Sequence, residues 1–89
     1  MTAEPTMAEA TTTYQRRIAE LWSAALGIEV TATDHDFFAG GGDSFQAVLV
    51  TASVRREWDV EVPVQLLVDH PVLADFADHV ARLTDERAR

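Results

Sequence analysis

Residues 37–45 read Phe-Phe-Ala-Gly-Gly-Gly-Asp-Ser-Phe, a glycine turn followed at once by the start of an apolar helical pattern. Three consecutive glycines keep side chains away from the approach to Ser44, and their backbones can adopt conformations closed to other residues. Asp43 and Ser44 both belong to the residue types that cap helix N-termini. The stretch therefore predicts a helix over about Ser44–Trp58 that begins beside an accessible serine hydroxyl.

The expected helix after the glycine turn carries two apolar stripes. One consists of Phe45, Val48, Leu49 and Ala52, and the other of Ala47, Val50, Val54 and Trp58. A helix that is apolar on most sides is either central in its bundle or offers one side to partners. The pattern leaves both arrangements open and does not indicate which stripe is exposed.

An amphipathic helix is predicted before the turn, over Tyr14–Leu26, with Gly27 ending it. Thr12 and Gln15 have the spacing of a capping box at its start. Residues 28–42 show no sustained period and form a long loop. At least one of Phe37 and Phe38 should anchor this loop to the core.

Two further helices are predicted after the second one. Pro63 can open a short helix through Val68, and Pro71 can open a last helix. The apolar stripe of that last helix is Leu73, Phe76, Ala77, Val80 and Leu83. Residues 60–63 alternate like a strand, but a single unpaired strand is not stable. The predicted fold class is all-α: a small four-helix bundle with a short third helix and a long loop between helices 1 and 2.

With 89 residues the chain can hold one domain with a limited core. We expect a disordered N-terminal lead over residues 1–11, the domain over 12–84 and a C-terminal tail over 85–89. The net charge is -8, from 15 acidic residues against seven arginines. Such a surface repels nucleic acid and anionic membranes and suits partners with basic rims, although acidity kept for solubility explains the same charge.

Cysteine is absent, so the chain has no disulfide and no thiol nucleophile of its own. Any thioester chemistry would need a borrowed thiol. The chain shows neither a targeting signal nor an apolar stretch long enough to span a bilayer. We expect a cytoplasmic monomer.

Catalytic interpretations of Ser44 find little support in its surroundings. No lysine follows the glycines, as a phosphate-binding loop requires. A hydrolase would need His35, His70 or His79 as the base, but the residue-glycine pattern of a nucleophile elbow is missing after the serine. These histidines are expected to be ordinary surface or turn residues, and no catalytic residue is predicted.

The spacing of the aspartates and histidines does not match that of known metal-binding motifs. The sequence Asp34-His35-Asp36 could start a calcium loop, but Phe38, Ala39 and Phe45 stand where that loop needs an oxygen ligand, glycine and glutamate. The histidine spacings miss the helical two-histidine zinc pattern. No metal site is predicted, and the aspartates are expected to cap and to form turns.

Several motifs occur in a characteristic order along the chain and together resemble the carrier proteins of nonribosomal peptide synthesis. They are Leu26-Gly27, Asp34 with Asp36-Phe37-Phe38, Gly41-Gly42-Asp43-Ser44, Val62-Pro63-Val64 with Leu67, and His70-Pro71-Val72. The resemblance covers residues 12–83. It departs from the family at Gly40, where leucine is usual, and at Phe45, where leucine or isoleucine is usual.

The resemblance implies an acyl-carrier-like fold and a non-catalytic carrier whose Ser44 bears a 4'-phosphopantetheine arm. A phosphopantetheinyl transferase would attach this arm from coenzyme A, and its thiol would hold an aminoacyl or peptidyl group as a thioester. Adenylation, condensation or tailoring enzymes would then act on that cargo. The start at a methionine and the short flanks suit a free-standing member of the family, although an excised module of a larger synthetase would look much the same.

Family partners contact the loop before the serine, the start of the second helix and the third helix. On this chain the corresponding candidates are Asp43, Phe45, Val48, Val64 and Leu67. Two alternatives remain: an acyl carrier of polyketide or fatty-acid synthesis, and an unmodified helical docking module in which Ser44 is only a helix cap.

Overall fold

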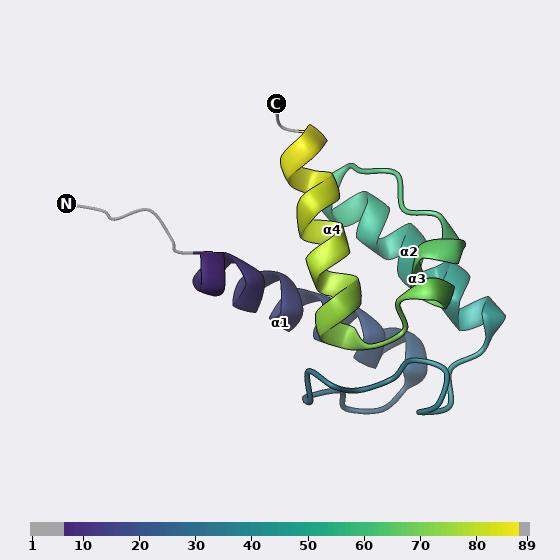
Figure 1. Ribbon diagram of the computed structural model, residues 1–89. Coiled ribbons are helices and arrows are strands. Elements are labelled where there is room, and N and C mark those ends of the chain that lie inside the picture. The colour runs from purple at the N-terminus through teal and green to yellow at the C-terminus, as the bar shows by residue number, and fades with distance from the viewer. Residues whose placement is uncertain (1–6, 88–89) are drawn as a thin grey trace.

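The computed structural model describes residues 7–87, which form four helices joined by loops (Figure 1). These are α1 (Met7–Leu26), α2 (Ser44–Trp58), α3 (Val64–Asp69) and α4 (Leu73–Arg87). Helix α1 packs against both α2 and α4, and α3 packs against α2. The all-α architecture with a short third helix and a long α1–α2 loop is confirmed.

Helix α1 begins earlier than the sequence analysis predicts. It starts at Met7, so Thr12 lies inside the helix and the predicted capping box with Gln15 is wrong. Residues 7–10 read Met-Ala-Glu-Ala and contain neither glycine nor proline, so strong helix formers carry the helix past the polar threonines. The expected disordered lead over residues 1–11 falls partly on residues 1–6, which lie outside the described part of the chain.

Helix α4 extends further than predicted at its C-terminus. It continues to Arg87, beyond the expected domain end at residue 84. The Arg87 guanidinium donates to the backbone oxygen of Asp59 at 2.7 Å and to its carboxylate at 2.6 Å. Asp59 follows α2 with a left-handed backbone, φ 54°. The last turn of α4 is thus held to the end of α2 by a contact between distant parts of the chain.

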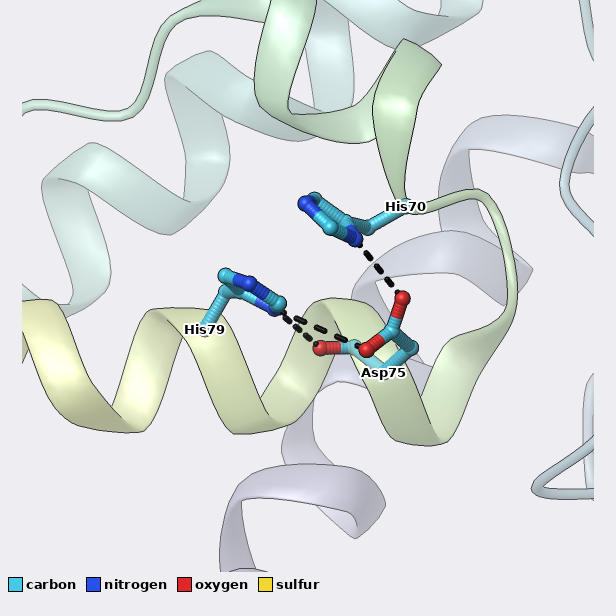
Figure 2. A group of neighbouring side chains, drawn as sticks. All are labelled: His70, Asp75 and His79. Carbon is cyan, nitrogen blue, oxygen red and sulfur yellow. Dashed lines mark hydrogen bonds and ion pairs between the residues drawn. The ribbon is translucent and has the colours of Figure 1, made fainter.

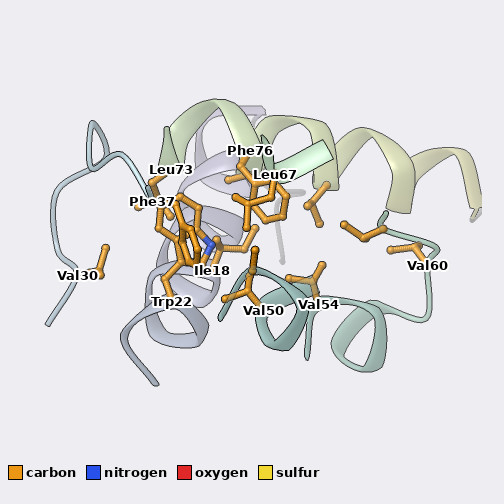
Figure 3. Packing of buried hydrophobic residues seen from close by; sticks show 14 residues of the cluster. Ile18, Trp22, Val30, Phe37, Val50, Val54, Val60, Leu67, Leu73 and Phe76 are labelled. Carbon is orange, nitrogen blue, oxygen red and sulfur yellow. The ribbon is translucent and has the colours of Figure 1, made fainter. Parts of the chain in front are cut away.

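The core draws on every helix and on the loops between them (Figure 3). Its members are Ile18, Trp22, Val30, Phe37, Ala47, Val50, Val54, Val60, Val62, Leu67, Leu73, Phe76, Ala77 and Val80. Trp22 packs edge-on against Phe37 with ring centroids 5.1 Å apart, and its centroid lies 6.0 Å from that of Phe76. Val60 and Val62 contribute to this core from a loop, so rejecting a strand there is confirmed.

An ion pair also joins α1 to α2 at the surface. Arg17 donates to Glu57 at 2.9 Å and to Glu20 at 2.9 Å. The hydrogen bond from Arg17 holds the pKa of Glu57 below its usual range, and the same bond raises the pKa of Arg17. Both groups are substantially exposed, so the pair contributes little to stability.

Candidate functional site

Ser44 is the first residue of α2, and its neighbour Asp43 caps the helix. The Asp43 carboxylate accepts from the backbone N–H of Gln46 at 2.9 Å, and the Gln46 side-chain oxygen accepts from the Asp43 N–H at 3.0 Å. Ser44 is exposed, and its hydroxyl makes no hydrogen bond to any residue that the structure describes. The interpretation of Ser44 as merely a helix cap is wrong, because the capping box satisfies these donors without it.

Steric constraints explain why the turn in front of Ser44 consists of glycines. Gly41 adopts φ +109°, a conformation that residues with side chains rarely take. A Cβ atom on Gly42 would lie 2.6 Å from both the Phe37 ring and the Phe37 carbonyl oxygen. The Gly42 N–H donates to that same carbonyl at 2.9 Å. The chain can therefore turn tightly over Phe37 only without side chains at these positions.

The long loop is anchored at Phe37, as predicted. This side chain is fully buried, and its backbone N–H donates to the Pro71 carbonyl at 2.8 Å. An isolated bridge joins Asp36 to Val72. The Asp36 carboxylate accepts from the N–H groups of Phe38 and Ala39 at 3.0 and 2.9 Å, which confirms its expected role in turn formation. The loop before Ser44 is thereby fixed to the residues that precede α4.

The start of α2 is also tied to the end of α1. The Gln46 side-chain nitrogen donates to the Ala25 carbonyl at 3.3 Å, while the oxygen of the same amide completes the capping box. One side chain thus holds the first turn of α2 to the last turn of α1. Ser44 therefore lies on a helix start that is held by side-chain contacts, although the loop before it is long.

Gly40, the first departure from the family pattern, is explained by His35. A Cβ atom on Gly40 would lie 2.6 Å from the His35 Nε2 atom. That nitrogen is buried and has no hydrogen-bond partner among the described residues. His35 is a half-buried turn residue, because its N–H donates to the Ala32 carbonyl at 3.2 Å. The imidazole fills the space where a leucine side chain at position 40 would begin.

The structure decides which stripe of α2 is exposed. Ala47, Val50 and Val54 are fully buried, whereas Phe45, Val48 and Leu49 are 70%, 49% and 43% exposed. We call these last three residues the α2 patch. They follow Ser44 directly on its helix, and Phe45, the second family departure, is the most exposed of them.

The predicted recognition residues divide on burial. Asp43, Phe45 and Val48 are exposed, and Val64 is half-buried against the core. Leu67 is fully buried, so its prediction as a surface contact is wrong. It is the side chain through which the short helix α3 joins the core. Leu49 and Val68, which are 43% and 48% exposed, are further exposed apolar side chains that were not among the predicted recognition residues. The i, i+4 spacing of Leu49 from Phe45 was the available signal.

The structure supplies no catalytic apparatus around Ser44. None of the three histidines makes a hydrogen bond to Ser44 within residues 13–87, the part whose side chains are described. A hollow of about 590 Å³ lies between α1 and the long loop, lined in part by Ala19, Ser23 and Val30, and Ser44 does not border it. Among the described residues, Ser44 is exposed, makes no hydrogen bond to a histidine and does not line this hollow.

The surroundings of Ser44 do fit an attached phosphodiester. The hydroxyl projects from the N-terminal end of a 15-residue helix, where the helix dipole favours a negative charge. The first turn of α2 contains no acidic residue, and the acidic side chain directly before it is the Asp43 cap. The glycines on the preceding turn leave room for a flexible chain bound to the oxygen.

In residues 7–87 no helix is long and apolar enough to cross a membrane.

Comparisons with known proteins agree with this geometry. Residues 16–80 match a family model described as the phosphopantetheine attachment site. An N-(5-amino-5-carboxypentanoyl)-L-cysteinyl-D-valine synthase of Amycolatopsis lactamdurans is 41% identical over 66 residues, covering 74% of this chain and 2% of the synthase. The chain thus corresponds to a small fraction of that relative's length.

Solved structures extend the match to the fold. BlmI of Streptomyces verticillus, a type-II acyl carrier protein involved in bleomycin biosynthesis, superimposes with a TM-score of 0.77 at 30% identity, over 81% of this chain and 87% of BlmI. A peptidyl carrier protein solved in complex with the phosphopantetheine transferase Sfp and coenzyme A gives a TM-score of 0.74 at 32% identity, over 91% and 99%. The matched family model and these carrier structures show that the chain belongs to the phosphopantetheine-binding carrier family.

Proposed function

We propose that Ser44 is the residue that bears the 4'-phosphopantetheine arm. The observation that carries this proposal is the exposed Ser44 at the start of α2, whose hydroxyl makes no hydrogen bond to the described residues while Asp43 caps the helix. In the transfer, the Ser44 oxygen forms a bond to the phosphorus that bears the pantetheine. The phosphoanhydride bond of coenzyme A breaks and adenosine 3',5'-bisphosphate leaves. The hydroxyl proton passes to a base of the transferase.

The arm supplies the thiol that this cysteine-free chain lacks. On it, the protein would hold an aminoacyl or peptidyl group as a thioester and carry that group between enzymes. A tether raises the effective concentration of its cargo at each active site that it can reach. The chain's own residues present the attachment point and identify the carrier to its partners.

The α2 patch is the surface that we assign to partner recognition, together with Asp43 and Val64. Three exposed apolar side chains on one helix face next to the attachment point let a partner read the carrier while the arm enters its active site. The net charge of -8 favours partners with basic rims. We expect these partners to be a phosphopantetheinyl transferase and the adenylation, condensation or tailoring enzymes of a cytoplasmic synthesis, served by a monomeric carrier.

Intact-mass measurement after incubation with coenzyme A and a broad-specificity transferase tests the attachment site. The wild-type chain should gain one phosphopantetheine, and Ser44→Ala should gain none. Ser53→Ala is the matched control, because Ser53 lies on the same helix and its hydroxyl donates to the Leu49 carbonyl at 2.9 Å. Unmodified wild-type protein, or a Ser44→Ala variant that still gains the arm, would refute the assignment.

An acyl carrier is the second candidate, favoured by the likeness to BlmI, which is described as an acyl carrier protein. Loading assays separate the two functions. The peptidyl carrier interpretation expects transfer from an adenylation enzyme with an amino acid. Exclusive loading from acyl donors would replace it and leave the Ser44 assignment intact.

A further inference from the structure

A cluster of two histidines and one aspartate lies on the surface at the junction of α3 and α4. The Nδ1 atom of His70 is 2.7 Å from the Asp75 carboxylate, and the Nδ1 atom of His79 is 2.9 Å from the Asp75 carbonyl and 3.7 Å from its carboxylate. One potential ligand atom from each residue lies within 4.8 Å of the others. Figure 2 shows both rings turning the same edge toward Asp75.

The cluster forms because the chain folds back at the end of α3. His70 caps that helix, with its N–H donating to the Leu66 carbonyl at 3.0 Å. Asp75 is in the first turn of α4, and His79 lies one turn further along the same helix face. His70 and His79 are nine residues apart in sequence, so a search for two histidines on one helix misses them.

We propose that His70, Asp75 and His79 bind a divalent transition-metal ion of the zinc class. Two imidazole nitrogens with one carboxylate oxygen are ligands that Zn²⁺ accepts, and three protein ligands leave a fourth tetrahedral position for water. Both Nδ1 atoms now approach oxygens of the same residue. The ion would replace those hydrogen bonds, with each imidazole carrying its proton on Nε2 instead.

Binding requires a small rearrangement of the rings. They are stacked, with centroids 3.8 Å apart and planes inclined by 24°. A metal ion must lie close to the plane of each imidazole that ligates it, so the rings have to open about their Cβ–Cγ bonds. The His70 and His79 side chains are 30% and 29% exposed, and Asp75 is 51% exposed, which leaves room for that rotation. An occupied site would tie the end of α3 to the second turn of α4.

Zinc titration by calorimetry tests the site in the full chain carrying Ser44→Ala and no polyhistidine tag. The substitution removes the phosphopantetheine thiol, which would itself bind zinc. We expect one saturable event with a stoichiometry of one, and affinity at least tenfold weaker in His79→Gln and in Asp75→Asn. Asp78→Asn is the control, since it removes a neighbouring carboxylate of α4 that pairs with Arg82. No saturable binding, or equal affinity in all variants, would overturn the proposal.

A second measurement needs no substitution in the cluster, so a variant that fails to fold does not weaken the test. Ring ¹⁵N resonances of the three histidines are followed in the same Ser44→Ala chain as Zn²⁺ is added. The proposal expects the Nδ1 signals of His70 and His79 to shift together with saturation at one equivalent, while His35 stays unchanged. A shift at His35, or at only one ring of the pair, would contradict the site. The proposal stands or fails independently of the modification of Ser44.

Discussion

Val48 and Val50 offer a matched test of the two faces of α2, because the same substitution removes the same atoms from an exposed and a buried position. Val50 is fully buried, whereas Val48 is 49% exposed. Val50→Ala removes two buried carbons at about 0.8 kcal/mol each, and the cavity left behind adds to this cost. The higher helix propensity of alanine stabilises the variant by about 0.5 kcal/mol. The expected loss in free energy of unfolding is about 2 kcal/mol.

For Val48→Ala the same terms nearly cancel. Because Val48 is about half exposed, the substitution loses only about half of the transfer free energy of the two carbons, and water fills the vacated space. The higher helix propensity of alanine offsets most of that loss. We expect a change within about 0.5 kcal/mol of wild type. Urea denaturation measures both variants, and the melting temperature of Val50→Ala should fall by about 8–16 °C. Equal losses for the two variants would refute the burial assigned to α2.

The same pair separates stability from recognition. If the α2 patch contacts partners, Val48→Ala should lower the kcat/KM of the transferase for this carrier about fivefold, equivalent to ~1 kcal/mol. Val50→Ala, assayed well below its melting temperature, should react at nearly the wild-type rate. The reverse order of effects would remove the patch from the recognition surface.

Three further perturbations test the site and its support. Asp43→Ala should lower the free energy of unfolding by about 0.5–2 kcal/mol in urea titrations, because it removes the cap of α2, and an unchanged midpoint would contradict the capping box. Gly42→Ala should cost about 1–3 kcal/mol, since its Cβ would lie 2.6 Å from the Phe37 ring, and an equally stable variant would show that the turn relaxes freely. Arg17 lowers the pKa of Glu57, so the stabilisation from this pair is present above the usual pKa of a glutamate and is lost as pH falls through the lowered value. Glu57→Gln should therefore be less stable than wild type at neutral pH, with the difference vanishing in acid, and a pH-independent difference in denaturation midpoints would exclude this origin.

Much of the fold was predictable because its signals are local. The start and end of α2 matched the prediction, since capping and apolar spacing are set by residues within one or two turns of each other. An anchor at Phe37 or Phe38 was predictable because an aromatic residue in a polar loop needs a buried place, and the structure identifies Phe37 as the fully buried one. The start of α1 was misplaced because helix formers before Thr12 outweighed the capping signal, and other errors arose from contacts between distant residues. Helix α4 runs past its expected end because Arg87 bonds to Asp59, a residue far away in the sequence.

The sequence alone indicated Ser44 as the proposed attachment point and predicted the helical framework. Ser44, its glycine turn and the helix that follows depend on backbone sterics and hydrogen bonds between near neighbours, which a linear pattern records. The tertiary structure alone decided which stripe of α2 faces solvent, placed Leu67 in the core, and put His35 where Gly40 leaves space. It also brought His70 and His79 together. Each of these outcomes depends on how helices pack against one another, and periodicity within one segment carries no information about its neighbours.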